Sequence, residues 1–201
     1  KVSIEYIEAC GDCFYLAMEA ALSEEEGWSP YVAVGTMRDV VASSMTEETF
    51  KLYTLLYEQQ AEEFKFMCGV DSLDSLRKRV RLRGQKVGAS KCVWADGFAM
   101  ETIANHFQLL LLVVDERSSQ KFTRIAPVGL KANGELASSS DAAENISAGQ
   151  PTVLLHASQR EHMNLIMYDG RRVQPIGQLP LALQRLWNLS VQPLGDDGAP
   201  A

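Results

Sequence analysis

Cysteine is scarce in this sequence: four occur among 201 residues, at positions 10, 13, 68 and 92. A small secreted domain that depends on disulfides has more cysteines in a shorter chain, so this usage favours a reducing, cytoplasmic location. A structural zinc site usually takes two close pairs of ligands. Cys10 and Cys13 form one such pair, but Cys68 and Cys92 do not form a second. We therefore expect no metal and no cofactor.

Excess positive charge and long apolar runs are also lacking. The net charge is −7 at pH 7, whereas binding to a phosphate backbone needs clustered basic residues. The longest apolar run, Leu109 to Val114, is far shorter than the roughly 20 residues of a membrane-spanning helix. We therefore expect no nucleic-acid partner and no membrane segment.

The composition that is present suits a folded domain, and we expect the protein to be a monomer. Hydrophobic residues make up 46% of the chain and charged residues 22%, as in ordinary globular proteins. A chain of this length can bury a sizeable core. We expect one domain over residues 1–190 and a flexible tail over residues 191–201.

Helical patterns fill the first half of the chain and strand patterns the second. Three- and four-residue spacing of apolar residues predicts a helix from Thr46 to Gly69. Helices are also predicted at 14–22, which is rich in Ala, Leu and Met, at 36–45, and from a cap at Asp71 or Ser72 through Val80. A short strand is predicted before these helices, at 2–6, and a further helix begins near Asp96. After it, strands are predicted at 108–116, 121–129, 152–157 and 163–170, with a surface loop at 131–150 and a last helix at 179–187. This order predicts an α+β fold with a mostly antiparallel sheet.

Cys13 is the first candidate for chemistry, because it stands where the helix of residues 14–22 begins. Unpaired backbone N–H groups at a helix N-terminus lower the pKa of a thiol and can stabilise an oxyanion. Gly11, which lacks a Cβ, permits an unusual turn just before it. This stretch alone fits a small apolar core cysteine equally well.

His162 is the candidate base among three histidines. His106 follows a helical pattern and His156 lies within a strand pattern, so both fit structural roles. His162 instead opens the strand "HMNLIMY" at the rim of the predicted sheet. Asn164 leaves the same face of that strand two residues later, where its amide oxygen can orient the imidazole. Cys13, His162 and Asn164 thus match the nucleophile, base and orienting residue of a cysteine triad.

Two other interpretations of the pair Cys10–Cys13 fit less well. A thioredoxin-like redox site needs a βαβ setting, which the helical first half does not supply. "CGDCFY" has the form of the papain signature, but papain-like enzymes have glutamine where Ile7 stands, and their asparagine follows the histidine at a distance. Another papain-like cysteine protease remains a remote alternative.

With these residues identified, the chain resembles the ovarian-tumour (OTU) family of cysteine proteases, most of which are deubiquitinases. "GDCFYLA" is similar to the family motif D-G-x-C-[LF]-[FY]-x-A, with Cys13 as nucleophile. "WADGFAMETIANHF" followed by "LLLLVV" is similar to the family's W-G-x, helix and buried strand. "EHMNLI" is similar to its terminal H-[YF]-[ND]. The segments come in the family's order and span residues 10–168.

The sequence departs from the family pattern at several positions. Cys10 stands where the family usually has an aspartate that shapes the oxyanion loop, so the stabilisation of this loop must come from other residues. Met163 replaces the aromatic residue between His162 and Asn164. Ala95 replaces the glycine after Trp94, and the usual glutamate of the following helix is displaced.

The resemblance implies a papain-superfamily fold and hydrolysis of ubiquitin or ubiquitin-like conjugates by Cys13, His162 and Asn164. The backbone N–H groups of Gly11, Asp12 and Cys13 would form the oxyanion hole. An inserted helical arm over about residues 36–88 would bind ubiquitin or a polyubiquitin chain. The alternative is a catalytically inactive ubiquitin-binding module, and by analogy such a divergent domain suits a pathogen effector acting in the host cytosol.

Overall fold

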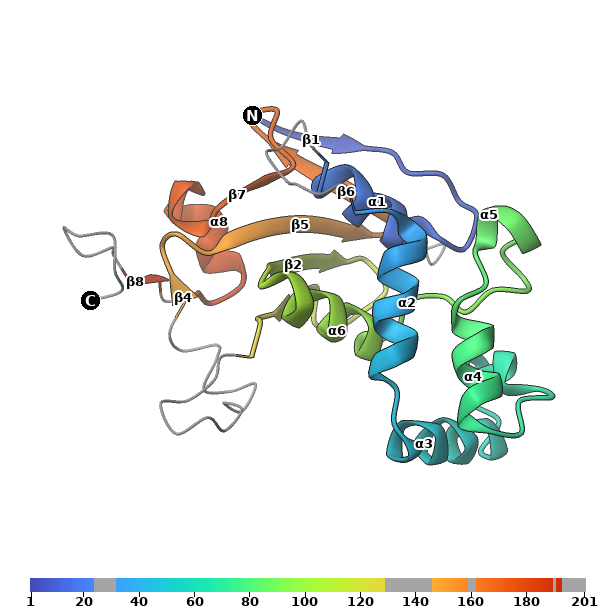
Figure 1. Cartoon of the computed structure of the whole chain (residues 1–201). Helices are drawn as coiled ribbons and strands as arrows, with labels where there is room; N and C mark the ends of the chain where they lie inside the picture. The colour runs from blue at the N-terminus through green and yellow to red at the C-terminus, as the bar shows by residue number, and fades with distance from the viewer. Residues whose placement is uncertain (24–31, 129–145, 159–161, 190, 193–201) are drawn as a thin grey trace.

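The computed structural model describes residues 1–23, 32–128, 146–158, 162–189 and 191–192 (Figure 1). The fold is α+β. Its main sheet has the strand order β1-β6-β5-β2-β3, and β7 pairs with β5 beside this path. The strands are β1 Val2–Glu5, β2 Leu110–Asp115, β3 Phe122–Ile125, β5 Pro151–Ala157, β6 Met163–Tyr168 and β7 Val173–Pro175. Only the β2–β5 pair within this sheet is parallel, so the expected α+β, mostly antiparallel arrangement is confirmed.

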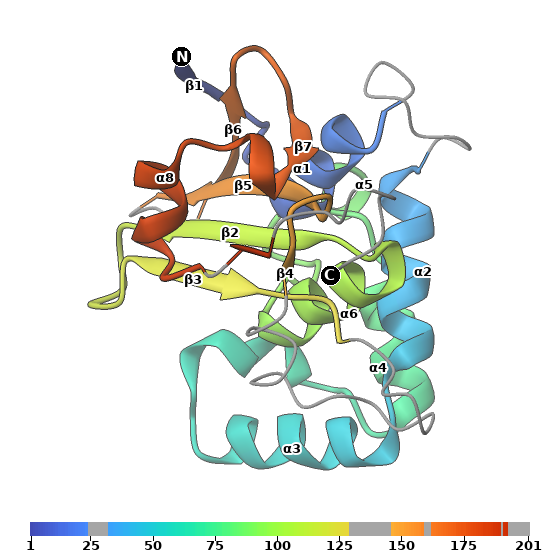
Figure 2. The ribbon, with the colours of Figure 1, turned by 90° about the vertical axis from the view of Figure 1, so that its left-hand side faces the viewer.

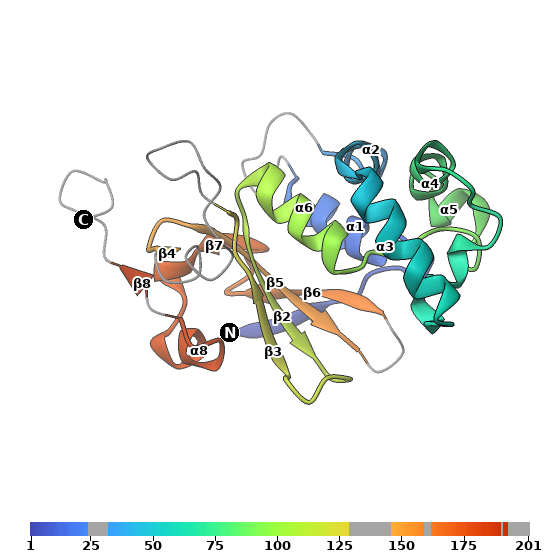
Figure 3. The same ribbon diagram turned by 90° about the horizontal axis from the view of Figure 1, so that it is seen from below.

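Helices cover both faces of the sheet, and this explains the continuous apolar runs of its central strands. Helices α1 (Cys13–Ala21), α2 (Val34–Ser44) and α6 (Gly97–Phe107) lie on one face, and α8 (Leu181–Leu186) lies on the other (Figure 3). Successive side chains of a strand point to opposite faces. Accordingly Leu111 and Val113 of β2 join the core beneath α1 and α6, while Leu110 and Leu112 join the core beneath α8.

The predicted arm lies between α1 and α6 in the sequence. Besides α2, it contains α3 (Glu47–Glu58), the 3-10 helix η2 (Glu62–Met67), α4 (Leu73–Val80) and α5 (Gly84–Val87). Figure 2 shows α3 running below α6, away from the sheet. Thr46 and Ser72 cap α3 and α4, each accepting a hydrogen bond from the backbone N–H three residues on, as the sequence indicated.

The single helix expected from Thr46 to Gly69 was wrong. Helix α3 ends at Glu58, and Gln60 has a φ of 61°, in the left-handed region. The chain then turns back, so that Phe64 and Phe66 of η2 contact the ring of Tyr53 on α3 at centroid distances of 5.0 and 5.9 Å. Packing of these rings is favourable, and it requires the break that helical spacing alone does not reveal.

The remaining predicted elements are placed as follows. The strand patterns became β1, β2, β3, β5 and β6, and Asp96 caps α6 by accepting from the N–H of Ala99 at 2.9 Å. In the predicted loop, Ile146–Ser147 forms β4, which pairs with β8 (Val191–Gln192). Residues 129–145 of that loop, residues 159–161 before His162, and residues 193–201 of the predicted tail lie outside the described residues. None of the described helices combines the length and hydrophobicity needed to cross a lipid bilayer.

Candidate active site

A cavity of about 970 Å³ lies where the N-terminus of α1 meets the beginning of β6. Cys13, the first residue of α1, lines it, and so do His162 and Met163 at the start of β6. Cys13 is 8% exposed, and His162 is half-buried. The fold thus brings the two residues, distant in sequence, to the wall of one cavity.

Asn164 lies deeper than His162. It is 3% exposed, and its Oδ1 accepts a hydrogen bond from the backbone N–H of Ile7 at 3.2 Å. An amide oxygen has two lone pairs, so a second bond to an imidazole remains available to it. Within the described parts of the chain, no side-chain hydrogen bond joins Cys13, His162 and Asn164 in this conformation.

Gly11 provides the turn that leads into Cys13. Its φ is +85°, in the region that residues with a side chain rarely adopt. A Cβ added at this position would lie 2.4 Å from the Sγ of Cys92 and 3.2 Å from Nε1 of Trp94. Residues 10–12, which precede the candidate nucleophile Cys13 and are called the nucleophile loop below, are therefore pressed against the wall of the cavity, because Cys92 and Trp94 line it too.

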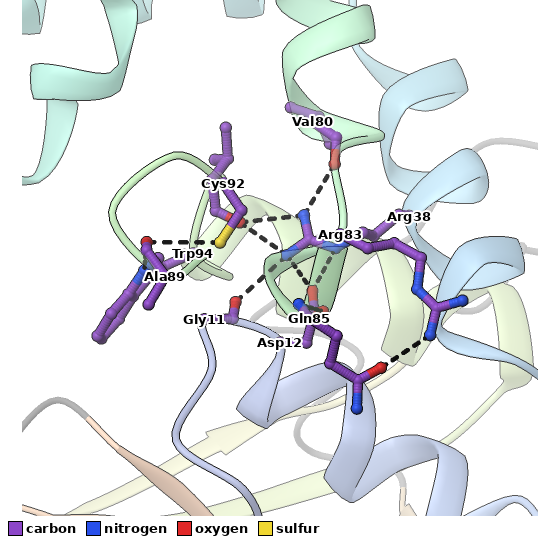
Figure 4. Close-up of polar contacts among 10 residues, drawn as sticks. Gly11, Asp12, Arg38, Val80, Arg83, Gln85, Ala89, Cys92 and Trp94 are labelled. Atoms are coloured by element: carbon purple, nitrogen blue, oxygen red, sulfur yellow. Dashed lines mark hydrogen bonds and ion pairs between the residues drawn. The ribbon is translucent and has the colours of Figure 1, made fainter. Parts of the chain in front are cut away.

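Asp12 is the N-cap residue of α1, but its carboxylate does not cap the helix. It is fully buried, and its Oδ1 accepts from Nε of Arg38 at 2.8 Å and lies 2.6 Å from Nη2 of the same guanidinium. Its Oδ2 accepts from the backbone N–H of Gln85 at 2.9 Å (Figure 4). Only the backbone of Asp12 was predicted to belong to the site, and these side-chain contacts were not predicted.

Arg38, on α2, was missed entirely. Its guanidinium is fully buried and donates to the carbonyl oxygens of Gly11 (3.2 Å), Val80 (2.8 Å) and Val93 (3.1 Å). It also lies 4.4 Å from the ring centroid of Tyr15 on α1. Arg38 therefore joins the nucleophile loop, the C-terminal end of α4 and the segment before α6. A lone arginine within the helix predicted at 36–45 gave no signal of this role.

Cys10 and Cys13 are both free thiols, as are Cys68 and Cys92. Burial raises the pKa of Cys10, and the same effect raises the pKa of Cys92. The carbonyl oxygen of Cys10 packs so closely on Gly84 that a Cβ there would lie 2.0 Å from it. Across the described residues, no group of three or more His, Cys, Asp and Glu side chains is arranged to hold a metal ion.

Apolar and charged side chains both line the cavity. Trp94, 40% exposed, and Met100 contribute apolar surface. Nε1 of Trp94 donates to the carbonyl of Ala89 at 2.8 Å, which fixes the indole. Glu62 and Glu63 of η2 also line the cavity, and so does the turn between β2 and β3. The lining thus combines an apolar surface with carboxylates.

The other two histidines lie away from this lining. His106, in the last turn of α6, contacts Phe107 edge to face at a centroid distance of 4.7 Å. His156 on β5 shares a hydrogen bond of 2.9 Å between its Nε2 and Oε1 of Glu116. The structural roles expected for both stay predictions.

Comparison with known proteins gave matches in structure alone. No family model matches the sequence, and no curated protein matches it. An OTU deubiquitinase from Wolbachia pipientis wMel has a TM-score of 0.46 and 11% identity, covering 92% of this chain and 95% of that one. An OTU domain solved in complex with ubiquitin has a TM-score of 0.48 and 11% identity, with 92% and 80% covered. The viral OTU domain protease from Taggert virus has a TM-score of 0.42 and 10% identity, with 87% and 83% covered. The solved structures to which this fold is similar thus include several OTU domains.

Proposed function

We propose that this protein is a cysteine isopeptidase that hydrolyses ubiquitin or ubiquitin-like conjugates. The observation that carries the proposal is the placement of Cys13, at the N-terminus of α1, and His162, at the start of β6, on one cavity. A thiol at a helix N-terminus beside an imidazole is the arrangement that nucleophilic catalysis on a carbonyl requires.

The reaction would proceed in two halves. His162 takes the proton of the Cys13 thiol, and the thiolate attacks the carbonyl carbon of the modifier's terminal glycine. Backbone N–H groups of Gly11, Asp12 and Cys13 stabilise the oxyanion, and His162 protonates the departing lysine amine. Water, deprotonated by His162, then hydrolyses the thioester and releases the glycine carboxylate. Asn164 would hold the imidazole in a productive orientation.

The arm supplies the surface for the modifier in this proposal. Glu58, Glu62 and Glu63 are exposed, and Glu62 and Glu63 also line the cavity that contains Cys13. Carboxylates at this rim would attract the basic face and tail of ubiquitin. The protein would act as a monomer in a reducing compartment, where the thiol stays free.

One pair of observations favours a second candidate, an inactive ubiquitin-binding module. The Oδ1 atom of Asn164 is already bonded to the N–H of Ile7, and Cys10 stands where the family pattern expects an aspartate. In a module of this kind the same cavity would bind the modifier's tail without cleaving a bond.

A ubiquitin probe with a thiol-reactive electrophile at its C-terminus distinguishes the two candidates. The isopeptidase proposal expects a covalent adduct on Cys13, located by fragment-ion mass spectrometry, that is lost in Cys13→Ala and strongly slowed in His162→Ala. The matched control is Cys68→Ser, because Cys68 is an exposed thiol on the arm, outside the cavity lining. Binding of ubiquitin without an adduct supports the module. An adduct that persists in Cys13→Ala would overturn the assignment of the nucleophile.

A further inference from the structure

We propose that Arg38 and Asp12 form a positioning pair that holds the nucleophile loop in its reactive geometry. The inference rests on the proposed function, because it names the residues that set the geometry of the same site. Neither residue touches the substrate in this proposal, and both act through the backbone that precedes Cys13.

The guanidinium of Arg38 is buried, and each of its three nitrogen atoms has a hydrogen-bond partner. Arg38 and Asp12 are both 0% exposed. Nε and Nη2 approach Oδ1 of Asp12, Nη1 donates to Val80 and Val93, and Nη2 donates to Gly11 and Val93. The planar guanidinium has donors in fixed directions. Its contacts therefore define the relative positions of the segments around it.

Arg38 holds atoms that lie directly before Cys13 in the chain. The Gly11 carbonyl and the Asp12 carboxylate belong to the two residues immediately before Cys13 (Figure 4). The Val93 carbonyl belongs to the residue before Trp94, which lines the cavity. One side chain thus ties the nucleophile loop to the surface along which a substrate would lie. Movement of Arg38 would change the position of the Cys13 sulfur relative to that surface.

The charges of Arg38 and Asp12 contribute to the geometry of the loop more than to the stability of the fold. A buried ion pair adds little net stability compared with apolar residues of similar size, because both charges must leave water. Charge-assisted hydrogen bonds nevertheless fix geometry closely. With Cys10 where the family pattern has aspartate, Asp12 supplies the loop's carboxylate from a different position, and Arg38 holds it from the side of α2. This pair therefore stabilises the loop in place of a carboxylate at position 10.

The test uses three pair variants, which are Asp12→Asn, Arg38→Met and the double variant that combines them. Their control is Asp39→Asn. Asp39 is the matched control, because it is the next residue on α2 and forms an exposed pair with Arg81 at 2.7 Å. Circular dichroism and urea unfolding identify the conditions in which each variant is folded. Under those conditions, labelling by the ubiquitin probe is measured as a function of probe concentration.

We expect the maximal labelling rate to fall roughly 100-fold in the three pair variants, as for a misplaced reacting group. The probe concentration that gives half of this rate should stay unchanged, and Asp39→Asn should resemble the wild type in both. The double variant removes both charges, so it should unfold less readily than Arg38→Met and yet remain slow. A purely structural role instead predicts that labelling recovers together with stability, and that result would overturn the inference. If Arg38→Met fails to fold, Asp12→Asn, which keeps the side-chain shape, provides the same comparison.

A second measurement separates failure of this inference from failure of the proposed function. Alkylation of Cys13 by iodoacetamide at one fixed pH needs no ubiquitin, and fragment ions separate Cys13 from Cys10. We expect the alkylation rate of Cys13 in the folded protein to change in the pair variants and to stay unchanged in Asp39→Asn, because the loop of the pair variants no longer holds the sulfur in the same place. If the wild type resists the ubiquitin probe and this change still occurs, the isopeptidase proposal fails and the positioning role stands. If the probe labels the wild type and the pair variants equally well, only the positioning role fails.

Discussion

Substitution of Gly11 by alanine should destabilise the protein for two separable reasons. At a φ of +85°, an added side chain costs about 1–2 kcal/mol in backbone strain. The new Cβ would also lie 2.4 Å from Sγ of Cys92 and 3.0 Å from Cα of Ala89, and an overlap of this kind costs about 1–3 kcal/mol. The unfolding free energy should therefore fall by roughly 2–5 kcal/mol.

A matched glycine isolates the first contribution. Gly69 has a φ of +74°, and an added Cβ there would meet nothing within 4 Å. Gly69→Ala should therefore cost only the strain, about 1–2 kcal/mol. Urea unfolding followed by tryptophan fluorescence measures both variants.

The overlap with Cys92 can be tested by a double-mutant cycle. Cys92→Ala removes the sulfur nearest to the new Cβ, so Gly11→Ala combined with Cys92→Ala should be less destabilised than the sum of the single variants by roughly 1–2 kcal/mol. Additivity within about 0.5 kcal/mol, or equal losses in Gly11→Ala and Gly69→Ala, would refute the argument that close packing holds this loop against the cavity wall.

Two further predictions concern the arm. Reversal of charge at Glu58, Glu62 and Glu63 should weaken ubiquitin binding to the Cys13→Ala protein without lowering its melting temperature. The larger effect is expected at Glu62 and Glu63, which line the cavity. Unchanged affinity in a titration would contradict the proposed docking surface. Burial raises the pKa of Tyr53 above its ordinary value of 10.0, and contact with Asp96 adds to the rise. Because the unfolded phenol ionises first as the pH increases, the unfolding free energy should decline above about pH 10, by at most about 1.4 kcal/mol per pH unit for this group. Urea titrations should show a smaller decline in Tyr53→Phe, and an equal decline would assign the alkaline loss to other groups.

The sequence predicted the elements whose signals are local. Alternation in β1, the apolar runs of β2 and β5, and the caps Thr46, Ser72 and Asp96 lie within a few residues of the structures they specify. The break after Glu58 was not predicted, because it depends on Phe64 and Phe66 packing on Tyr53. Side-chain packing of this kind is tertiary information, and it overrides helical spacing.

The candidate site divides in the same way. Cys13, Gly11 and His162 could be proposed from the sequence, because their motifs join a residue type to the start of a helix or a strand. Arg38 could not, since its partners Gly11, Asp12, Val80 and Val93 come from three other segments. The cysteine at position 10 can be read from the sequence, but the contacts of the Asp12 carboxylate with Arg38 and Gln85 are visible only in the folded chain.

The arm contacts the rest of the fold at two points, at its base through Arg38 of α2 and near its tip through Tyr53 of α3. These contacts restrict how the arm can contribute to activity. At the base, Arg38 of α2 donates to the carbonyl of Val80 at the end of α4 as well as to the nucleophile loop. Near the tip, the hydroxyl of Tyr53 donates to Asp96, the N-cap residue of α6. An element held at two points cannot swing as a free lid without breaking buried polar contacts, which is costly. Substitutions at the base should therefore affect the rate of the chemical step, and those at the exposed carboxylates should affect the binding of the modifier.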